Sequence, residues 1–206
     1  MKTKLLITIL TCVAASVSSS RSFAAEPKVG SEAPAFTLND STGKAHSLAD
    51  FKGKFVVLEW FNEGCPFVKK HYTSGNMQKL QGEYTGKDVV WLSINSSAPG
   101  EQGHMTAESA PKTVNDWKIK STQILFDHDG KVGKMYGAKT TPHMFVIDKA
   151  GKLVYQGAID SKATASTGDI DGAENYVKVA LDSTMAGKPV ENSSTKPYGC
   201  SVKYAK

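Results

Sequence analysis

The chain has 206 residues, of which 40% are apolar and 22% are charged, and its formal net charge is +5. This length is enough for one α/β domain with its own hydrophobic core and is too short for two such domains. No cluster of basic residues is interleaved with aromatic residues, which argues against a nucleic-acid-binding protein.

Residues 1–24 are predicted to be a secretory signal peptide. A basic start, MKTK, precedes the short apolar run LLITILTCVAASV, and small residues lead to a predicted cleavage after Ala24. Cleavage removes three basic residues and no acidic one, so the net charge falls from +5 to +2. Because the apolar run is shorter than the roughly 20 residues of a spanning helix, we expect a periplasmic or secreted protein with no stable membrane insertion. An uncleaved anchor is the alternative.

The rest of the chain is predicted to alternate between strands and helices. Successive βαβ units followed by an antiparallel strand hairpin indicate an α/β fold, with a mixed sheet and helices on both faces. The tail at 187–206 is rich in Pro and Ser, and we expect it to be mobile. In chain order the predicted elements are a β-hairpin at 26–50 placed before the main sheet, a strand at 55–61, a helix interrupted near residue 75 at 66–84, a strand at 88–96, a helix at 105–117, a strand at 123–126, a short helix at 131–137, a strand hairpin at 144–159 and a helix at 171–186.

Cys65 stands between a predicted central strand and a predicted helix. The apolar run FVVLEWF is typical of a buried strand, and Pro66 is favoured at the first helical position because its missing N–H would be unpaired there. At a helix N-terminus the macrodipole and the free N–H groups lower a cysteine pKa from about 8.5 into the range of roughly 3.5–7.5. We therefore predict that Cys65 is a reactive thiol; a buried, inert cysteine is the alternative.

Two segments carry a resemblance to a known family, VVLEWFNEGCPF and FDHDGKVGKMYGAKTTPHMFVIDKAGKLVYQG. With the order of elements around them, they resemble the thioredoxin fold, specifically the extracytoplasmic redoxins grouped with alkyl hydroperoxide reductase and thiol-specific antioxidant proteins. The resemblance predicts one redoxin domain at 28–186, followed by the tail at 187–206.

The same resemblance implies a partner-binding element at Thr141-Pro142. In that fold the proline is cis and packs against the active-site cysteine, so backbone acceptors would face Cys65. An ordinary trans turn proline is the alternative. Pro66, Thr141, Pro142 and His143 are therefore the predicted substrate-binding residues.

Glu59 is a candidate proton relay. It lies six residues before Cys65, where thioredoxins carry a buried acid that assists proton transfer. A Glu inside an apolar strand is unfavourable unless it is partnered or neutral, which would raise its pKa; a strand residue facing an exposed edge is the alternative. We expect His71 and His143 to be surface residues, and we predict no metal and no cofactor because no Cys or His pair has a metal-motif spacing.

The chain departs from the families it resembles at two motifs. Val68 replaces the second cysteine of the C-x-x-C pair, giving CPFV, so Cys65 has no neighbouring partner. Peroxiredoxins carry P-x-x-x-T-x-x-C, where this chain has Leu58 and Asn62, and after cleavage it has no Arg. A fast peroxidase is disfavoured because Lys cannot reproduce the guanidinium fork.

Cys200 is the second cysteine of the mature chain. It lies in a tail that could fold back over Cys65, and it is the predicted resolving thiol. A structural clamp is the alternative, since a disulfide closing so long a loop stabilises by about 5 kcal/mol at most. We predict an extracytoplasmic thiol-disulfide oxidoreductase with Cys65, Cys200 and Glu59 as catalytic residues. Its partners would be a thiol- or disulfide-bearing protein or small molecule, and a redox partner that supplies or accepts electrons. The other possible functions are a thiol-dependent peroxidase with an antioxidant role and a redox-inert binding module with a structural Cys65–Cys200 disulfide.

Overall fold

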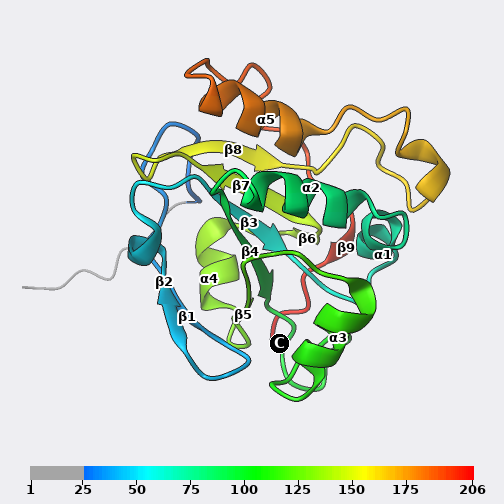
Figure 1. The fold of residues 1–206 in the computed structure, drawn as a ribbon. Coiled ribbons are helices and arrows are strands. Elements are labelled where there is room, and N and C mark those ends of the chain that lie inside the picture. The colour runs from blue at the N-terminus through cyan, green and yellow to red at the C-terminus, as the bar shows by residue number, and fades with distance from the viewer. Residues whose placement is uncertain (1–25) are drawn as a thin grey trace, which may run out of the picture.

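The computed structural model describes residues 26–206, so the predicted signal peptide lies outside the described residues. Within this range a seven-stranded sheet forms the middle of the molecule (Figure 1). Its strands are β1 (Thr37–Asp40), β2 (Ala45–Ser47), β3 (Val56–Trp60), β4 (Val90–Asn95), β5 (Gln123–Phe126), β7 (His143–Ile147) and β8 (Leu153–Gly157).

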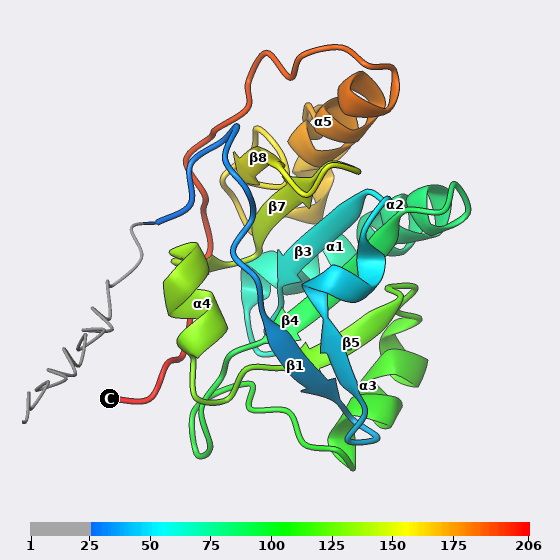
Figure 2. The same ribbon diagram turned by 90° about the vertical axis from the view of Figure 1, so that its left-hand side faces the viewer.

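Helices cover both faces of this sheet, as predicted. They are α1 (Pro66–Thr73), α2 (Asn76–Thr85), α3 (Ser109–Trp117), α4 (Lys131–Tyr136) and α5 (Tyr176–Met185), with short 3-10 turns at Leu48–Phe51 and Thr167–Asp169. The helix α4 lies on one face, and the other four lie on the opposite face (Figure 2). None of the helices between residues 26 and 206 is both long enough and apolar enough to span a membrane.

The strand β3 is the centre of the sheet, whose order is β2-β1-β5-β4-β3-β7-β8. It pairs parallel with β4 and antiparallel with β7, so the sheet is mixed. All five residues of β3 are buried. Because side chains alternate along a strand, Val57 faces the core under α1, α2 and α5, whereas Leu58 and Trp60 face the core under α4.

The N-terminal β-hairpin is part of the main sheet, which corrects the prediction that it lies before it. The strand β1 pairs antiparallel with β5, with Asn39 opposite Phe126 and Asp40 opposite Leu125. Without β1 the backbone groups along this side of β5 would form an open edge, so the hairpin satisfies them.

Two helices begin later than predicted, and each follows a segment held by side-chain hydrogen bonds to the backbone. Ahead of α3, the backbone N–H of Thr106 donates to the Ser109 hydroxyl at 2.9 Å, and the N–H of Ser109 donates to the Thr106 hydroxyl at 3.2 Å. Ahead of α5, the Asn175 side chain accepts a hydrogen bond from the backbone N–H of Lys178 at 2.9 Å. Such side-chain bonds fix the first turn of a helix.

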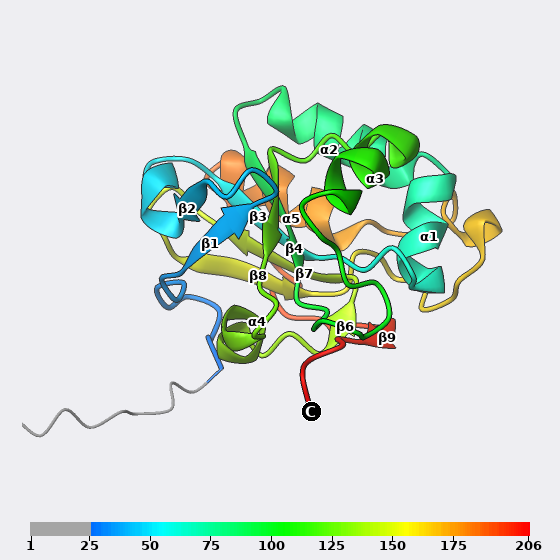
Figure 3. The ribbon, with the colours of Figure 1, turned by 90° about the horizontal axis from the view of Figure 1, so that it is seen from below.

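The tail folds back over the domain and is attached to it along its length. The backbone N–H of Thr195 donates to the carbonyl of Gln156 in β8 at 3.0 Å. Further on, β9 (Cys200–Ser201) pairs with β6 (Thr140–Thr141) in a separate two-stranded sheet. Figure 3 shows β9 beside β6. Backbone pairing of this kind is not visible in a Pro- and Ser-rich composition.

Candidate functional site at Cys65 and Cys200

Cys65 directly precedes the first residue of α1, as the sequence predicts. Its backbone is extended, with φ −85° and ψ 124°, and Pro66 begins the helix. Its side chain is fully buried, at 0% exposure, in the core on the α1 face of the sheet. The first N–H groups of a helix have no partner within the helix, so they are available to a sulfur atom at this position.

The fold brings Cys200 into contact with Cys65. In the antiparallel pairing of β9 with β6, Cys200 lies opposite Thr141. The two sulfur atoms are 2.7 Å apart, and the Cys65 thiol also donates to the carbonyl oxygen of Thr141 at 3.0 Å. Both cysteines are free thiols in this structure. Their contact places an internal disulfide within reach.

The two thiols differ in pKa. Burial by itself would raise the pKa of Cys65, but hydrogen bonds from the Cys200 thiol and from the Val68 backbone N–H outweigh burial and lower it below its ordinary value. Burial and the adjacent Cys65 sulfur raise the pKa of Cys200 to about 11. Cys65 is therefore the thiol that ionises first, and Cys200 keeps a proton with which it stabilises the thiolate.

Thr141 and Pro142 lie beside the two sulfur atoms. The Thr141-Pro142 peptide bond is cis, which confirms that part of the prediction. The Thr141 hydroxyl is buried and has no hydrogen-bond partner within residues 26–206. This hydroxyl also helps to lower the pKa of Cys65, because it can donate to the thiolate.

Glu59 is fully buried in the central strand, so the alternative of an exposed edge position is wrong. Burial raises the pKa of its carboxyl group, although four hydrogen bonds oppose that effect. No hydrogen bond joins Glu59 to either sulfur atom among the described residues. The four donors to its carboxylate are Tyr72 at 2.9 Å, Gln81 at 3.1 Å, Trp91 at 2.8 Å and Ser93 at 3.1 Å.

His71 and His143 are buried, with 0% and 5% exposure, which corrects the expectation of surface positions. Burial lowers the pKa of His71 to about 4 and that of His143 to about 3, so both are neutral at pH 7. The Nδ1 atom of His143 accepts from the Lys139 backbone N–H at 3.2 Å, and His71 Nε2 lies 3.3 Å from the Tyr198 hydroxyl. No group of three or more His, Cys, Asp or Glu side chains within residues 26–206 is arranged to hold a metal ion.

Asn62, which occupies the threonine position of the peroxiredoxin motif, has a structural set of contacts. Its amide nitrogen donates to the Ser97 hydroxyl at 3.1 Å and to the Gln102 carbonyl at 2.9 Å. Its oxygen accepts from the Gly64 backbone N–H at 2.7 Å. Both ends of the side chain are therefore engaged in holding the loops around the start of α1.

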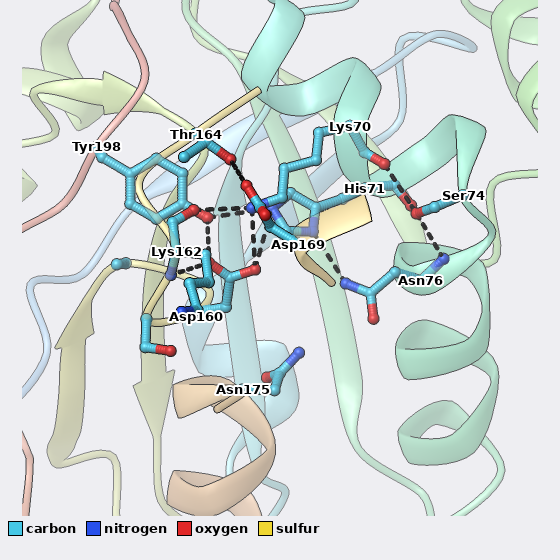
Figure 4. Close-up of polar contacts among 12 residues, drawn as sticks. Lys70, His71, Ser74, Asn76, Asp160, Lys162, Thr164, Asp169, Asn175 and Tyr198 are labelled. Carbon is cyan, nitrogen blue, oxygen red and sulfur yellow. Dashed lines mark hydrogen bonds and ion pairs between the residues drawn. The ribbon is translucent and has the colours of Figure 1, made fainter. Parts of the chain in front are cut away.

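Sequence reasoning missed a buried polar cluster next to the cysteines. Lys70 of α1 pairs with Asp160, and the Tyr198 hydroxyl donates to the same carboxylate (Figure 4). The sequence signals for it are weak. They are a lysine close to the inward-facing Val68 and Tyr72 on one helix, and a tyrosine two residues before Cys200.

Solved structures with a similar fold cover nearly the whole chain. An uncharacterized conserved protein from Geobacillus kaustophilus has a TM-score of 0.73 and 28% identity, over 86% of this chain and 93% of its own. A hypothetical protein from Sinorhizobium meliloti 1021 has a TM-score of 0.71 and 26% identity, over 88% of this chain and 97% of its own.

Sequence comparison finds a relative with a named activity and a family model. The thiol-disulfide oxidoreductase ResA of Bacillus thuringiensis subsp. konkukian (strain 97-27) is 30% identical over 129 residues, which are 63% of this chain and 69% of that protein. Residues 28–177, the greater part of the chain, match the family model described as Redoxin. The chain therefore belongs to the redoxin family and has its thioredoxin-like fold.

Proposed function

We propose that this protein is an extracytoplasmic thiol-disulfide oxidoreductase in which Cys65 is the attacking thiol and Cys200 the resolving thiol. The observation that carries the proposal is the contact between the two sulfur atoms, 2.7 Å apart. The lowered pKa of Cys65 and the raised pKa of Cys200 support this assignment of roles. The similarity to ResA, a thiol-disulfide oxidoreductase by name, supports the reaction class.

The proposed reaction has two exchange steps. In the first, the Cys65 thiolate attacks one sulfur of a substrate disulfide, and the other substrate sulfur leaves as a thiolate that takes up a proton. In the second, the Cys200 thiol loses its proton and attacks the Cys65 sulfur, which releases the remaining substrate thiol. One substrate disulfide becomes two thiols while two protein thiols become one disulfide, and the reverse sequence oxidises a dithiol.

A partner needs space next to Cys65 before the first step. Because Cys65 is fully buried, we propose that the segment around Cys200 moves away from β6. An extended segment of a thiol- or disulfide-bearing partner then binds the exposed strand edge, as in β-strand addition. In this proposal Thr141 and Pro142 bind the partner, with Pro66 and His143 beside them.

A proton-relay role for Glu59 remains a proposal. Its raised pKa supports the role because a buried acid can take up a proton near neutral pH. Its hydrogen bonds run to neighbouring side chains rather than to sulfur, so transfer to or from Cys200 requires an intervening water.

The predicted signal peptide supports a periplasmic or secreted location, where disulfide exchange takes place in an oxidising environment. The division into a domain at 28–186 and a tail at 187–206 is likewise proposed, and the tail has a functional part because it carries Cys200. A separate redox partner then restores the starting state after each cycle.

Turnover of a protein disulfide tests the proposal. Insulin reduction is followed with dithiothreitol as electron donor, for the wild-type chain, Cys65→Ser and Cys200→Ser. We expect the wild type to accelerate the reaction and Cys65→Ser to fall to the uncatalysed rate, since a serine hydroxyl is not a nucleophile at neutral pH. No acceleration by the wild type would contradict an oxidoreductase function.

The reduction potential separates catalysis from a structural clamp. A Cys65–Cys200 disulfide with a potential below about −300 mV, together with no turnover, would establish a structural bond. The peroxidase alternative gains no support from Asn62, whose side chain is occupied by contacts with the surrounding loops.

A further inference from the structure

A buried ion pair lies next to the point where the tail crosses the start of α1. The Nζ atom of Lys70 is 3.3 Å from Asp160 Oδ2, and the two side chains are 0% and 3% exposed. The same ammonium group donates to the carbonyl of Lys162 at 2.8 Å, and the Lys162 backbone N–H donates to Asp160 Oδ1 at 2.9 Å. Burying such a pair is unfavourable unless its remaining polar atoms are hydrogen bonded. The two backbone contacts at Lys162 supply part of that hydrogen bonding.

Tyr198 of the tail completes this cluster. Its hydroxyl donates to Asp160 Oδ1 and lies 3.3 Å from His71 Nε2 (Figure 4). The Lys70 ammonium is 5.5 Å from the centre of its ring, and the Phe67 ring meets it edge-on with centroids 5.9 Å apart. The tyrosine is therefore held by a charged hydrogen bond, a cation–π contact and an aromatic contact together.

We propose that the pocket formed by Lys70, His71 and Asp160, named the tyrosine pocket, binds Tyr198 and so holds Cys200 against Cys65. Tyr198 is then a positioning residue that acts through the tail. The inference rests on the proposed function for one point, that Cys65 is the thiol to which partners need access. It concerns the closed position of the tail and does not require catalytic turnover.

The short connection between Tyr198 and Cys200 makes this positioning effective. The single residue between them is Gly199, with φ +139°, and a Cβ atom there would lie 2.1 Å from the carbonyl oxygen of Thr141. The backbone therefore passes in direct contact with β6 at this point. With so little free chain, docking of the phenol restricts where the Cys200 sulfur can lie.

Docking has two opposite consequences for the thiols. It keeps Cys200 close to Cys65, which favours closure of the internal disulfide by raising the effective concentration of one thiol at the other. It also covers Cys65, which protects this thiol from reagents in solution. Weaker binding of Tyr198 in the tyrosine pocket is therefore expected to disfavour formation of the Cys65–Cys200 disulfide and to speed modification of Cys65 by reagents in solution.

The full-length Tyr198→Phe variant tests the proposal. It removes one hydroxyl and keeps the ring, and Asp160 retains Lys70 and Lys162 as partners, so the domain is expected to fold. The matched control is Tyr204→Phe in the same tail. The Tyr204 hydroxyl donates to a neutral carbonyl, that of Ala138, at 2.8 Å.

Two quantities are measured for both variants and the wild type. The first is the equilibrium between the dithiol and disulfide forms in glutathione buffers, where oxidised glutathione takes the two electrons and becomes two reduced molecules. The second is the rate at which iodoacetamide modifies Cys65 in the reduced protein, located by peptide mapping. Urea unfolding of the reduced variants checks that the domain is intact.

We expect Tyr198→Phe to weaken docking of the tail about tenfold, the size expected for the loss of a hydrogen bond to a charged group. Because the tail is docked in the dithiol form too, the factor by which the Cys65 alkylation rate rises, multiplied by the factor by which the closure equilibrium falls, should be about ten. Tyr204→Phe should change either quantity by less than about threefold, because its lost hydrogen bond is to a neutral acceptor. The proposal is contradicted if the two variants have equal effects, or if Tyr198→Phe moves neither quantity. Neither measurement depends on turnover of a substrate disulfide. Absence of turnover would contradict the proposed function and not the role of Tyr198.

Discussion

Cys65 and Cys200 are the same residue type in direct contact, yet their surroundings give them different chemistry. Cys65 lies at the start of a two-turn helix inside the core, whereas Cys200 lies in a two-residue strand on the tail and is partly exposed. The pKa of Cys65 is lowered and that of Cys200 is raised to about 11. The different surroundings of the two thiols therefore make Cys65 the easier one to ionise, which is the basis of the proposed attacking role.

The two regions also differ in how they can move. Displacing Cys65 would disturb α1 and the core beneath it. Displacing Cys200 breaks a short strand pair and the contacts of Tyr198. Segments with few buried contacts are the ones that open locally. A fixed Cys65 and a displaceable Cys200 fit the attacking and resolving roles proposed for them.

The largest expected effect comes from separating the two thiols by Gly199→Ala. The new Cβ would meet the Thr141 carbonyl at 2.1 Å, and φ +139° is strained for alanine. We expect the closure equilibrium in glutathione buffers to fall about a hundredfold, because clash and strain together disfavour the docked tail by a few kcal/mol.

Gly187→Ala is the control for that variant. Gly187 is the first residue of the tail and also has a positive φ, +69°, but nothing lies within 4 Å of a Cβ placed there. It should therefore leave closure nearly unchanged. If Gly199→Ala closes as readily as Gly187→Ala, the close approach of the tail to β6 does not control the contact of the two sulfurs.

The next effect concerns how the alkylation rate of each thiol depends on pH when the other cysteine is replaced by serine. In Cys200→Ser the serine hydroxyl can replace the Cys200 thiol as a hydrogen-bond donor to the Cys65 thiolate, so we expect the alkylation rate of Cys65 to level off below the ordinary pKa of 9.0. In Cys65→Ser burial still opposes ionisation of Cys200, whose rate should keep rising to pH 9 or above. At pH 7 the fraction of thiolate should differ about tenfold or more. If the alkylation rates of the two thiols had the same midpoint pH, the difference in pKa that supports the proposed roles of Cys65 and Cys200 would be absent.

The smallest effect is expected from Glu59→Gln, which tests whether the buried acid adds to the difference between the thiols. Burial raises the pKa of Glu59 above 4.5 in the folded state. The unfolded chain therefore loses this proton at lower pH, so the carboxyl group reduces stability as pH rises from about 4.5 to its folded pKa. Glutamine cannot ionise and should remove this decline.

Urea unfolding of the wild type and of Glu59→Gln between pH 4 and pH 8 measures the effect: the free energy of unfolding should fall more steeply with rising pH in the wild type than in the variant. Because Glu59 has no hydrogen bond to sulfur within the described residues, we expect single-turnover closure of the Cys65–Cys200 disulfide to slow less than about tenfold. A much larger loss confined to that step would show that the carboxyl group relays its proton directly.

The sequence was sufficient for the parts of the site that depend on local signals. Pro66 predicts the helix start and therefore the position of Cys65. The resemblance around Thr141-Pro142 predicts the cis bond, and the apolar run before Cys65 predicts the central strand.

The pairing of Cys65 with Cys200 was expected from the two cysteines of the mature chain. The other contacts of the tail could not be predicted in this way because they join residues far apart in the chain. Nothing in the helical pattern of α1 says that Lys70 and His71 are covered, since the cover is Tyr198 and the loop at Asp160. The same tail segment reads as mobile from its Pro and Ser content, whereas its order comes from pairing with β6 and β8. The amino-acid composition of a segment indicates its local conformational preference but not the distant strands with which it pairs.

Trapping of the mixed disulfide tests the central claim most directly. Reduced Cys200→Ser and Cys65→Ser are each treated with a stoichiometric disulfide substrate at pH 7, and intact-mass and peptide analysis locate the bound half. We predict a stable adduct at Cys65 in Cys200→Ser, an internal disulfide without adduct in the wild type, and no comparable adduct at Cys200 in Cys65→Ser. An adduct that forms equally fast on Cys200 would contradict the assignment of Cys65 as the attacking thiol.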